Sequence, residues 1–338
     1  MKAITFTTDG PTLADVPDPT PEADELLLQV EYCGICGTDL HAAQPDYHDG
    51  TVMGHEFSGT VLEAGRDVTG LREGDRVVVN PNGDWCGHCA QCAKGATNMC
   101  RNLWPNVIGL SRPGGLAARV AVRARTVHKL PDSVNLASAA LVEPLAVALR
   151  TVRKSGFTIG EDAIVFGAGP IGLLVTTLLR AAGAANVTVV ELSPARRELA
   201  LRQGASEALD PAVLPVAERF DDPDAAPAFA FECTGIAELV GQAAHVIRPR
   251  GTLTVTGFSR RPPSFEAADL LFKEVTIRGN FIYVEEFAQA IQALATGTID
   301  VTPLISGVVD VENATTAFDA MRTSPDAIKY LISAHHQR

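Results

Sequence analysis

The pattern of apolar and polar positions predicts a mixed α/β protein. Residues 1–10, MKAITFTTDG, alternate like a strand. A short apolar run at 162–166 leads into closely spaced glycines, and the apolar stretch 171–183, IGLLVTTLLRAAG, follows with the character of a helix. A second apolar run, NVTVVEL at 186–192, comes next. The middle of the chain is therefore expected to fold as strand, turn, helix and strand.

Further strand-like segments recur after this unit. They are SEALD at 206–210, AFAFECTG at 228–235, GTLTVTG at 251–257 and EVTIRGN at 274–280. Together with the two strands before them they give six strands, separated by helix-like or loop segments. This number and alternation predict an α/β fold with a doubly wound parallel sheet.

No segment has the apolar length that a membrane span requires. The most apolar window, 163–179, contains three glycines and a proline and is too short for a comfortable span. The first ten residues lack the apolar core of a secretory signal. These features predict a soluble, cytoplasmic protein that does not bind membranes.

The length and composition of the chain indicate the number of domains and argue against a nucleic-acid partner. The 338 residues correspond to about two domains of roughly 150 residues each. Apolar residues make up 46% of the chain and charged residues 20%, as in ordinary globular proteins. The formal net charge is −12 and there is no basic run, so no nucleic-acid partner is expected.

The glycines after the first predicted strand match a dinucleotide-binding turn. Their spacing is Gly167-x-Gly169-x-x-Gly172, between a strand and a helix. Glycines there permit a tight turn, close approach of the pyrophosphate and packing of the helix on the strand. The free N–H groups at the start of the helix, around Pro170 and Ile171, favour phosphate. These five residues are the predicted pyrophosphate site.

An acidic residue at the end of the next strand indicates which cofactor binds. Glu191 follows Gly167 by 24 positions, where a carboxylate suits the ribose hydroxyls of NAD and repels the 2′-phosphate of NADP. Arg196 and Arg197 come shortly after and would soften this repulsion, unless they only form a solvated helix face. The sequence therefore favours NAD over NADP.

Four cysteines lie within fifteen residues, in a loop-like stretch. Cys86, Cys89, Cys92 and Cys100 have the spacing of a closed tetrahedral zinc site with four sulfur ligands. Such a site has no open position, so its role is to fold a lobe that has little core of its own. His88 is an alternative ligand, and an iron–sulfur cluster or a redox pair are alternative uses of the cysteines.

A second set of residues has the mixed character of a catalytic zinc site. Cys36, His55 and Glu56 offer sulfur, nitrogen and oxygen ligands and leave a fourth position open. Glu143, just before a proline at a predicted helix start, is a fourth ligand, either direct or through water. Each residue alone has an ordinary structural explanation; the combination favours a metal.

Taken together, these motifs resemble the medium-chain zinc-dependent alcohol dehydrogenases. Within that family the chain is most similar to the polyol (sorbitol), butanediol and threonine dehydrogenase branch, over essentially its whole length. The motifs that carry the resemblance are CGICGTDLH, GHEFSGTV, GDRVVV, the four-cysteine lobe, EPLAVAL, VFGAGPIG, FECTG and LLFKEVTIRGN.

The resemblance implies a division of the chain that its periodicity alone does not give. Residues 1–145 would form a GroES-like, mainly-β catalytic domain with a structural zinc lobe at about 84–102. Residues 146–281 would form a Rossmann-type cofactor domain, and 282–338 would return to the catalytic domain. The family is oligomeric, so a homodimer or homotetramer is expected, joined at the edge strand around 277–283.

The resemblance also implies roles for single residues. Cys36 and His55 would hold the catalytic zinc with Glu143, Glu56 would bind it when no substrate is present, and Asp39 would orient a ligand. Thr38 and His41 correspond to a proton relay, although a turn-capping hydroxyl and a surface histidine are the plain alternatives. The remaining expected cofactor contacts are Thr234, Gly257 and Lys329.

The implied reaction is hydride transfer between a secondary alcohol and NAD(P), giving the ketone, with two zinc ions per chain. A polar segment, Asn80, Asn82, Asp84 and Trp85, either hydrogen-bonds a second hydroxyl of a polyol, diol or sugar-like substrate or only decorates the lobe. Rival interpretations are a threonine-type amino-alcohol dehydrogenase, a carbonyl reductase, and a non-catalytic nucleotide sensor. A zinc-ribbon nucleic-acid binder is disfavoured by the acidic charge.

Overall fold

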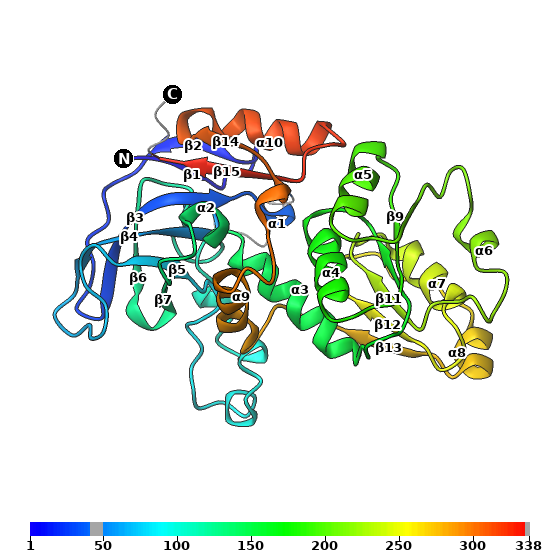
Figure 1. Ribbon diagram of the computed structural model, residues 1–338. Coiled ribbons are helices and arrows are strands. Elements are labelled where there is room, and N and C mark those ends of the chain that lie inside the picture. The colour runs from blue at the N-terminus through cyan, green and yellow to red at the C-terminus, as the bar shows by residue number, and fades with distance from the viewer. Residues whose placement is uncertain (41–49, 335–338) are drawn as a thin grey trace. The chain divides into compact units, whose positions relative to one another are not determined.

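The computed structural model describes residues 1–40 and 50–334 and divides into two compact units (Figure 1). The first unit comprises Met1–Glu143 and Phe287–Arg338, and the second is the continuous segment Pro144–Glu286. The chain thus leaves the first unit once and returns to it once. The crossings lie slightly before and slightly after the boundaries expected at 145 and 281.

The first unit is built on a seven-stranded, mostly antiparallel sheet and a separate two-stranded hairpin. The sheet order is β14-β15-β3-β4-β5-β7, with β6 also paired to β3, and β1 pairs with β2. The strands are β1 (Lys2–Thr5), β2 (Thr12–Asp15), β3 (Glu25–Gly34), β4 (Glu56–Ala64), β5 (Arg76–Val79), β6 (Arg119–Arg123), β7 (Val127–Lys129), β14 (Ile305–Asp310) and β15 (Lys329–Ser333).

Four described helices belong to the same part of the chain. They are α1 (Gly37–Leu40), α2 (Leu136–Ala139), α9 (Glu286–Ala295) and α10 (Ala314–Thr323). Of these, α2 contacts β3, β4 and β5, while α10 contacts β14 and β15. The core between strands and α10 is apolar and fully buried, with Phe57 from β4 and Phe318 from α10 among its largest side chains. Burial of such side chains supplies the main favourable free energy of folding.

The second unit is a doubly wound sheet in which every pairing is parallel. Its order is β10-β9-β8-β11-β12-β13, so the chain starts in the middle, runs to one edge, and then runs to the other. The strands are β8 (Ala163–Phe166), β9 (Val187–Val190), β10 (Glu207–Leu209), β11 (Phe229–Glu232), β12 (Thr252–Val255) and β13 (Thr276–Gly279). The predicted six-stranded fold is confirmed.

Helices connect these strands, as parallel pairing requires. They are α4 (Pro170–Ala181), α5 (Pro194–Arg202), α6 (Val216–Arg219), α7 (Ala237–Val246) and α8 (Ala267–Lys273), while α3 (Val142–Ser155) leads into the unit. Helix α4 packs on β8 and β9, and α7 packs on β11 and β12. Among the described residues no helix is both long and apolar enough to cross a membrane.

An ion-pair cluster explains why the return crossing lies at Glu286 rather than earlier. Glu286 is 3% exposed and accepts from Arg153 at 3.1 Å and from Arg150 at 3.4 Å, both on α3. Its other oxygen accepts the N–H of Val284 at 2.9 Å. These contacts keep the chain with the second unit up to the start of α9.

We expect Glu286→Ala to lower the free energy of unfolding by about 2 kcal/mol, because it removes a buried carboxylate that is the common acceptor of two arginine side chains and a backbone N–H. The neighbouring Glu285 is the matched control, since it is 62% exposed and pairs only with Arg153. Glu285→Ala should cost less than about 0.5 kcal/mol. Urea denaturation of both variants makes the comparison, and equal costs would mean that the cluster does not secure the crossing.

Candidate metal and cofactor sites

The four predicted cysteine ligands converge in a lobe of the first unit. The sulfur atoms of Cys86, Cys89, Cys92 and Cys100 all lie within 4.8 Å of one another. The Cys89–Cys92 separation is 3.5 Å and the Cys86–Cys92 separation is 4.0 Å. Four sulfurs at about 2.3 Å from one ion in a tetrahedron are roughly 3.8 Å apart, so the set fits zinc.

Backbone groups in the lobe prepare these sulfurs for a cation. The backbone N–H groups of Cys92 and Arg101 lower the pKa of Cys89 to about 5. At neutral pH the lobe therefore holds at least one thiolate, which is the form that binds metal. His88 turns its Nδ1 to the carbonyl oxygen of Cys86 at 2.8 Å and lies outside the four-sulfur set.

The second predicted set also comes together, at the ends of two neighbouring strands. Cys36 follows β3, His55 precedes β4, and Glu56 is the first residue of β4. Because β3 and β4 are antiparallel, with Gly34 opposite Glu56, the residues just beyond those ends meet. The ligand atoms of Cys36, His55 and Glu56 lie within 4.8 Å of one another.

Asp39 supports this set from behind. It is fully buried, its Oδ2 accepts the N–H of Cys36 at 2.9 Å, and its Oδ1 lies 3.6 Å from Nδ1 of His55. Burial would lower the pKa of His55, but the negative charges of Asp39 and Cys36 raise it well above its usual value. A carboxylate behind a ligand histidine fixes the ring and leaves Nε2 to bind metal.

Glu56 has a second partner that the sequence did not indicate. Nζ of Lys329 donates to its two oxygens at 2.9 and 2.7 Å and to the carbonyl oxygen of Ile35 at 2.7 Å. Lys329 is 1% exposed. Burial would lower the pKa of its ammonium, but the charge of Glu56 raises it. All three protons have acceptors in the first unit, so the phosphate contact expected of Lys329 stays a prediction.

The remaining expected catalytic residues are Glu143, Thr38 and His41. Glu143, the second residue of α3, is buried, and its charge contributes to the raised pKa of His55. It is not part of the three-residue ligand set. Thr38 lies in α1 and is half-buried. His41 lies outside the described residues.

The glycine-rich turn has the expected strand–turn–helix geometry. Gly167 follows β8 with φ of 94°, in the left-handed region that favours glycine. A Cβ atom at Gly172 would lie 1.9 Å from the carbonyl oxygen of Gly167, so the helix can approach the turn only without a side chain. Gly169 precedes α4, and Pro170 is its first residue.

Glu191 lies against this turn, as predicted for the ribose site. Its carboxylate accepts the N–H of Ala168 at 2.8 Å and the N–H of Ser193 at 2.9 Å. Arg197 donates to the carbonyl oxygen of Glu191 at 2.8 Å and pairs with Asp210 at 3.0 Å. Arg196 is in the first turn of α5, where its N–H donates to the side chain of Ser193 at 3.3 Å.

The loops after β11 and β12 reach the same end of the sheet. A Cβ atom at Gly167 would lie 2.7 Å from the methyl carbon of Thr234. Gly257 is as tightly enclosed, since a Cβ atom there would lie 2.1 Å from the nitrogen of Gly235. The carboxylate of Glu232 lies between these loops. The sequence analysis did not single out Glu232, although an acidic residue at the end of an apolar strand could have indicated it.

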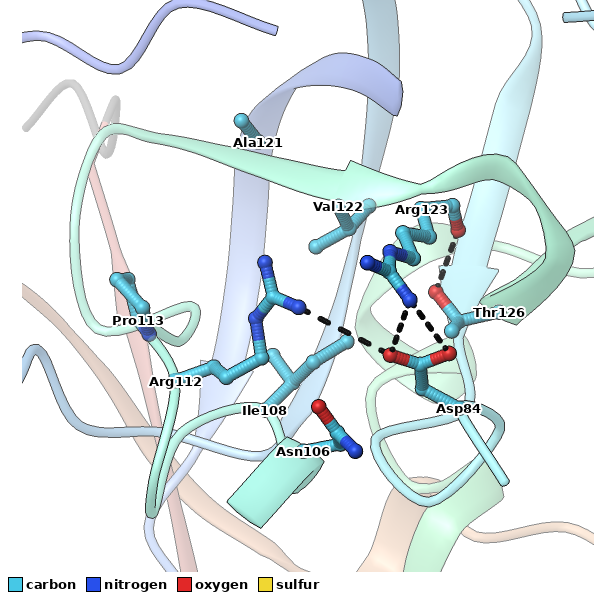
Figure 2. A pocket seen from close by; sticks show the side chains of 9 residues that line it. All are labelled: Asp84, Asn106, Ile108, Arg112, Pro113, Ala121, Val122, Arg123 and Thr126. Carbon is cyan, nitrogen blue, oxygen red and sulfur yellow. Dashed lines mark hydrogen bonds and ion pairs between the residues drawn. The ribbon is translucent and has the colours of Figure 1, made fainter. Parts of the chain in front are cut away.

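The polar segment before the lobe has another use in the structure. Figure 2 shows the guanidinium groups of Arg112 and Arg123 directed at Asp84, at 3.8 and 3.0 Å, and Arg125 also pairs with it. Asp84 is 5% exposed. Its carboxylate therefore fixes the base of the lobe, which favours the second of the two roles considered for this segment.

Two sequence families match the chain. The alcohol dehydrogenase GroES-like domain matches residues 22–132, and the zinc-binding dehydrogenase domain matches residues 170–296. A curated relative, 2-dehydro-3-deoxy-L-galactonate 5-dehydrogenase of Pseudoalteromonas atlantica, is 35% identical over 94% of both chains. These matches confirm the resemblance inferred from the motifs.

Solved structures of the same kind superpose closely. The 2R,3R-butanediol dehydrogenase of Bacillus subtilis has a TM-score of 0.88 and 31% identity over 99% of both chains. A zinc-binding dehydrogenase of Sinorhizobium meliloti 1021, solved with NADP, has a TM-score of 0.91 and 33% identity over 98% of both chains. Both the fold and the expectation of zinc with a nicotinamide cofactor are confirmed.

Single serine substitutions should separate the two metal sites. Cys36→Ser should lower the zinc content from about two ions to about one per chain and abolish turnover, because one ligand of the open set is lost. Cys89→Ser should also leave about one zinc, but with an unfolded lobe that proteases cleave. Metal analysis with limited proteolysis makes the test. Two zinc ions in active Cys36→Ser would contradict the assignment.

Proposed function

The chain belongs to the zinc-dependent medium-chain alcohol dehydrogenase family, and on that premise we propose that it oxidises a secondary alcohol to a ketone. The substrate is a polyol, a diol or a sugar-like molecule, and the hydride passes to NAD. The observation that carries this proposal is the open ligand set of Cys36, His55 and Glu56, in a chain that also has a complete dinucleotide fold.

The residues of the first unit divide the catalytic work. Cys36 and His55 would hold a zinc ion here, Asp39 keeps the imidazole in its ligand orientation, and Glu143 would complete the set directly or through water. A bound zinc ion would act as a Lewis acid and make a substrate hydroxyl more acidic near neutral pH. Glu56 exchanges between this set and its ion pair with Lys329.

The proton released by the substrate needs a path to water. We assign this relay to the hydroxyl of Thr38 and the imidazole of His41. A hydroxyl can pass a proton on without holding charge, and histidine exchanges protons near neutral pH. Loss of His41 would therefore slow turnover most near neutral pH, where a neutral imidazole can accept the proton and hydroxide is still scarce.

The cofactor site of the second unit favours NAD. The turn of Gly167, Gly169 and Gly172 and the start of α4, with Pro170 and Ile171, receive the pyrophosphate. Two backbone N–H groups fix the carboxylate of Glu191 beside the glycine turn. We expect it to accept hydrogen bonds from the ribose hydroxyls there, whereas a 2′-phosphate would meet its negative charge. Arg196, Thr234 and Gly257 complete the proposed contacts.

The proposal is tested by NADH and NADPH formation across diols, polyols, sugar acids, amino alcohols and simple secondary alcohols, on protein of known zinc content. We expect the highest kcat/KM with a polyhydroxylated substrate and NAD. The names of the relatives, a deoxygalactonate dehydrogenase and a butanediol dehydrogenase, support this substrate class. Highest activity with an amino alcohol such as threonine, or no oxidation by zinc-loaded protein, would refute it.

We further propose that two copies pair through the free edge of the second unit's sheet. β13 is exposed along its whole length, and beside it α8 exposes Leu271 and Phe272 at 71% and 82%. The N–H groups of Thr276 and Asn280 bond to the carbonyl oxygens of Gly251 and Val255, so those of Ile277 and Gly279 point outward. An exposed edge with outward N–H groups suits a second copy of the same strand.

Ile277→Pro should therefore convert a dimer to monomers, since it removes an outward N–H without removing a bond to β12. Ile277→Thr is the control, because it keeps the N–H and the β-branched shape and should stay dimeric. Sedimentation at several protein concentrations gives the masses. An unchanged mass in Ile277→Pro would place the interface elsewhere.

A further inference from the structure

Glu232 is a buried carboxylate that the proposed mechanism does not use. It is the last residue of β11 and is 1% exposed. It lies at the carboxyl end of the first strand after the sheet order reverses from β8 to β11. Dinucleotides bind at the carboxyl ends of the strands, at this reversal, in sheets of this type. Its position therefore belongs to the cofactor end of the second unit.

One oxygen of this carboxylate organises the loop that follows. Oε1 accepts the N–H of Thr234 at 2.7 Å, the N–H of Gly235 at 2.9 Å, and the hydroxyl of Thr234. The main-chain oxygen of Glu232 accepts the N–H groups of Thr256 and Gly257, at 2.9 and 3.0 Å. Glu232 thus joins the loops after β11 and β12, and through Thr234 it reaches the turn at Gly167.

The other oxygen has no partner. Oε2 is buried and accepts no hydrogen bond, and it points at Gly257, where a Cβ atom would lie 2.6 Å from it. Within residues 1–40 and 50–334, no lysine, arginine or histidine forms an ion pair with Glu232. Buried charges are normally both hydrogen-bonded and ion-paired, because burial is costly. Glu232 has hydrogen bonds on Oε1 but no ionic partner among the described residues, and at a cofactor-binding end this calls for a functional explanation.

The sheet indicates which half of the cofactor lies nearest. The strands β8, β9 and β10 carry the glycine turn and Glu191, which serve the pyrophosphate and the adenosine ribose. A fold built of two mononucleotide-binding halves leaves β11, β12 and β13 for the nicotinamide half. Glu232 closes the first strand of that half. Its negative charge is therefore on the side where the nicotinamide ring changes charge in the reaction.

We propose that Glu232 sets the relative affinity for the oxidised and reduced cofactor. The oxidised ring carries a positive charge and the reduced ring carries none, while the two pyrophosphates are alike. A fixed, unpaired negative charge in a medium of low dielectric constant therefore stabilises the oxidised form selectively. This role rests on the proposed nicotinamide-dependent activity and makes Glu232 a positioning residue that also supplies a field.

Two substitutions separate the charge from the hydrogen bonds. Glu232→Gln keeps an oxygen for the N–H groups of Thr234 and Gly235 but removes the charge. Glu232→Asp keeps the charge but shortens the side chain and weakens those bonds. Glu238→Gln is the matched control, because it removes an exposed negative charge from the first turn of α7, in the segment that follows the same strand.

The measurement is the pair of dissociation constants for NAD⁺ and NADH, by calorimetry and by NADH fluorescence, without substrate. In Glu232→Gln the ratio Kd(NAD⁺)/Kd(NADH) should rise on the order of tenfold, as expected for one charge acting over about 10 Å of protein. In Glu232→Asp both constants should rise together and leave the ratio near that of the unaltered protein. Glu238→Gln should change neither, because water and salt screen an exposed charge.

An unchanged ratio in Glu232→Gln, or a ratio that rises equally in Glu232→Asp, would overturn the inference. Either result would leave the proposed function standing, because the unaltered protein would still bind both cofactors. Failure of the unaltered protein to bind either cofactor would instead count against the proposed function. If Glu232→Gln does not fold, a changed ratio in Glu232→Asp still overturns the inference, since a charge role requires that variant to keep the ratio.

Discussion

A buried ion pair joins the last strand of the described chain to the proposed metal ligands and closes the first unit. Lys329 from β15 and Glu56 from β4 are each 1% exposed, and the ammonium is also bound by the carbonyl oxygen after β3. Breaking such a pair on one side typically costs about 3–5 kcal/mol, because the remaining charge has no partner. The docking of β15 therefore also brings in the positive charge of Lys329, which balances the carboxylate of Glu56 in the proposed metal site.

That balance is incomplete in a way that suits a divalent cation. Cys36, Asp39 and Glu56 all act on the ammonium of Lys329, and Glu143 acts on His55. The acidic groups outnumber the one lysine, and Oδ1 of Asp39 and Nδ1 of His55 have no hydrogen-bond partner among the described residues. The proposed metal site therefore has excess negative charge and an oriented imidazole, and both favour the binding of zinc. The four-cysteine lobe has no open ligand position, which fits the structural role proposed for it.

Features carried by short stretches of sequence were predictable. The glycine turn and the cysteine lobe are such features, since each brings together residues that are close in the chain. The six strands of the second unit were also predictable, because parallel strands buried on both faces read as apolar runs. The expectation that the first unit is made of two separate segments came from the family resemblance, because the hydrophobic periodicity does not reveal it.

What escaped prediction depends on pairs far apart in sequence. Lys329 was expected to meet a phosphate, and only the antiparallel β15–β3–β4 arrangement brings it to Glu56. Asp84 meets arginines from the far side of the lobe, and the isolation of Glu232 becomes visible only when every neighbouring side chain is in place. The spacing of residues in the sequence can suggest partners within a loop, but it cannot show that a buried carboxylate lacks an ionic partner.

The order of strands along the chain also determines when the protein can become active during its synthesis. The second unit is one continuous segment, so it can fold while the ribosome is still adding residues. The first unit is complete only when β15, which follows every other strand of the described chain, fits between β14 and β3. Until then the proposed zinc ligands lack Lys329, in a nascent chain whose second unit can already be folded. Synthesis that stops before β15 would therefore leave a chain with a folded nucleotide-binding unit and no finished zinc site.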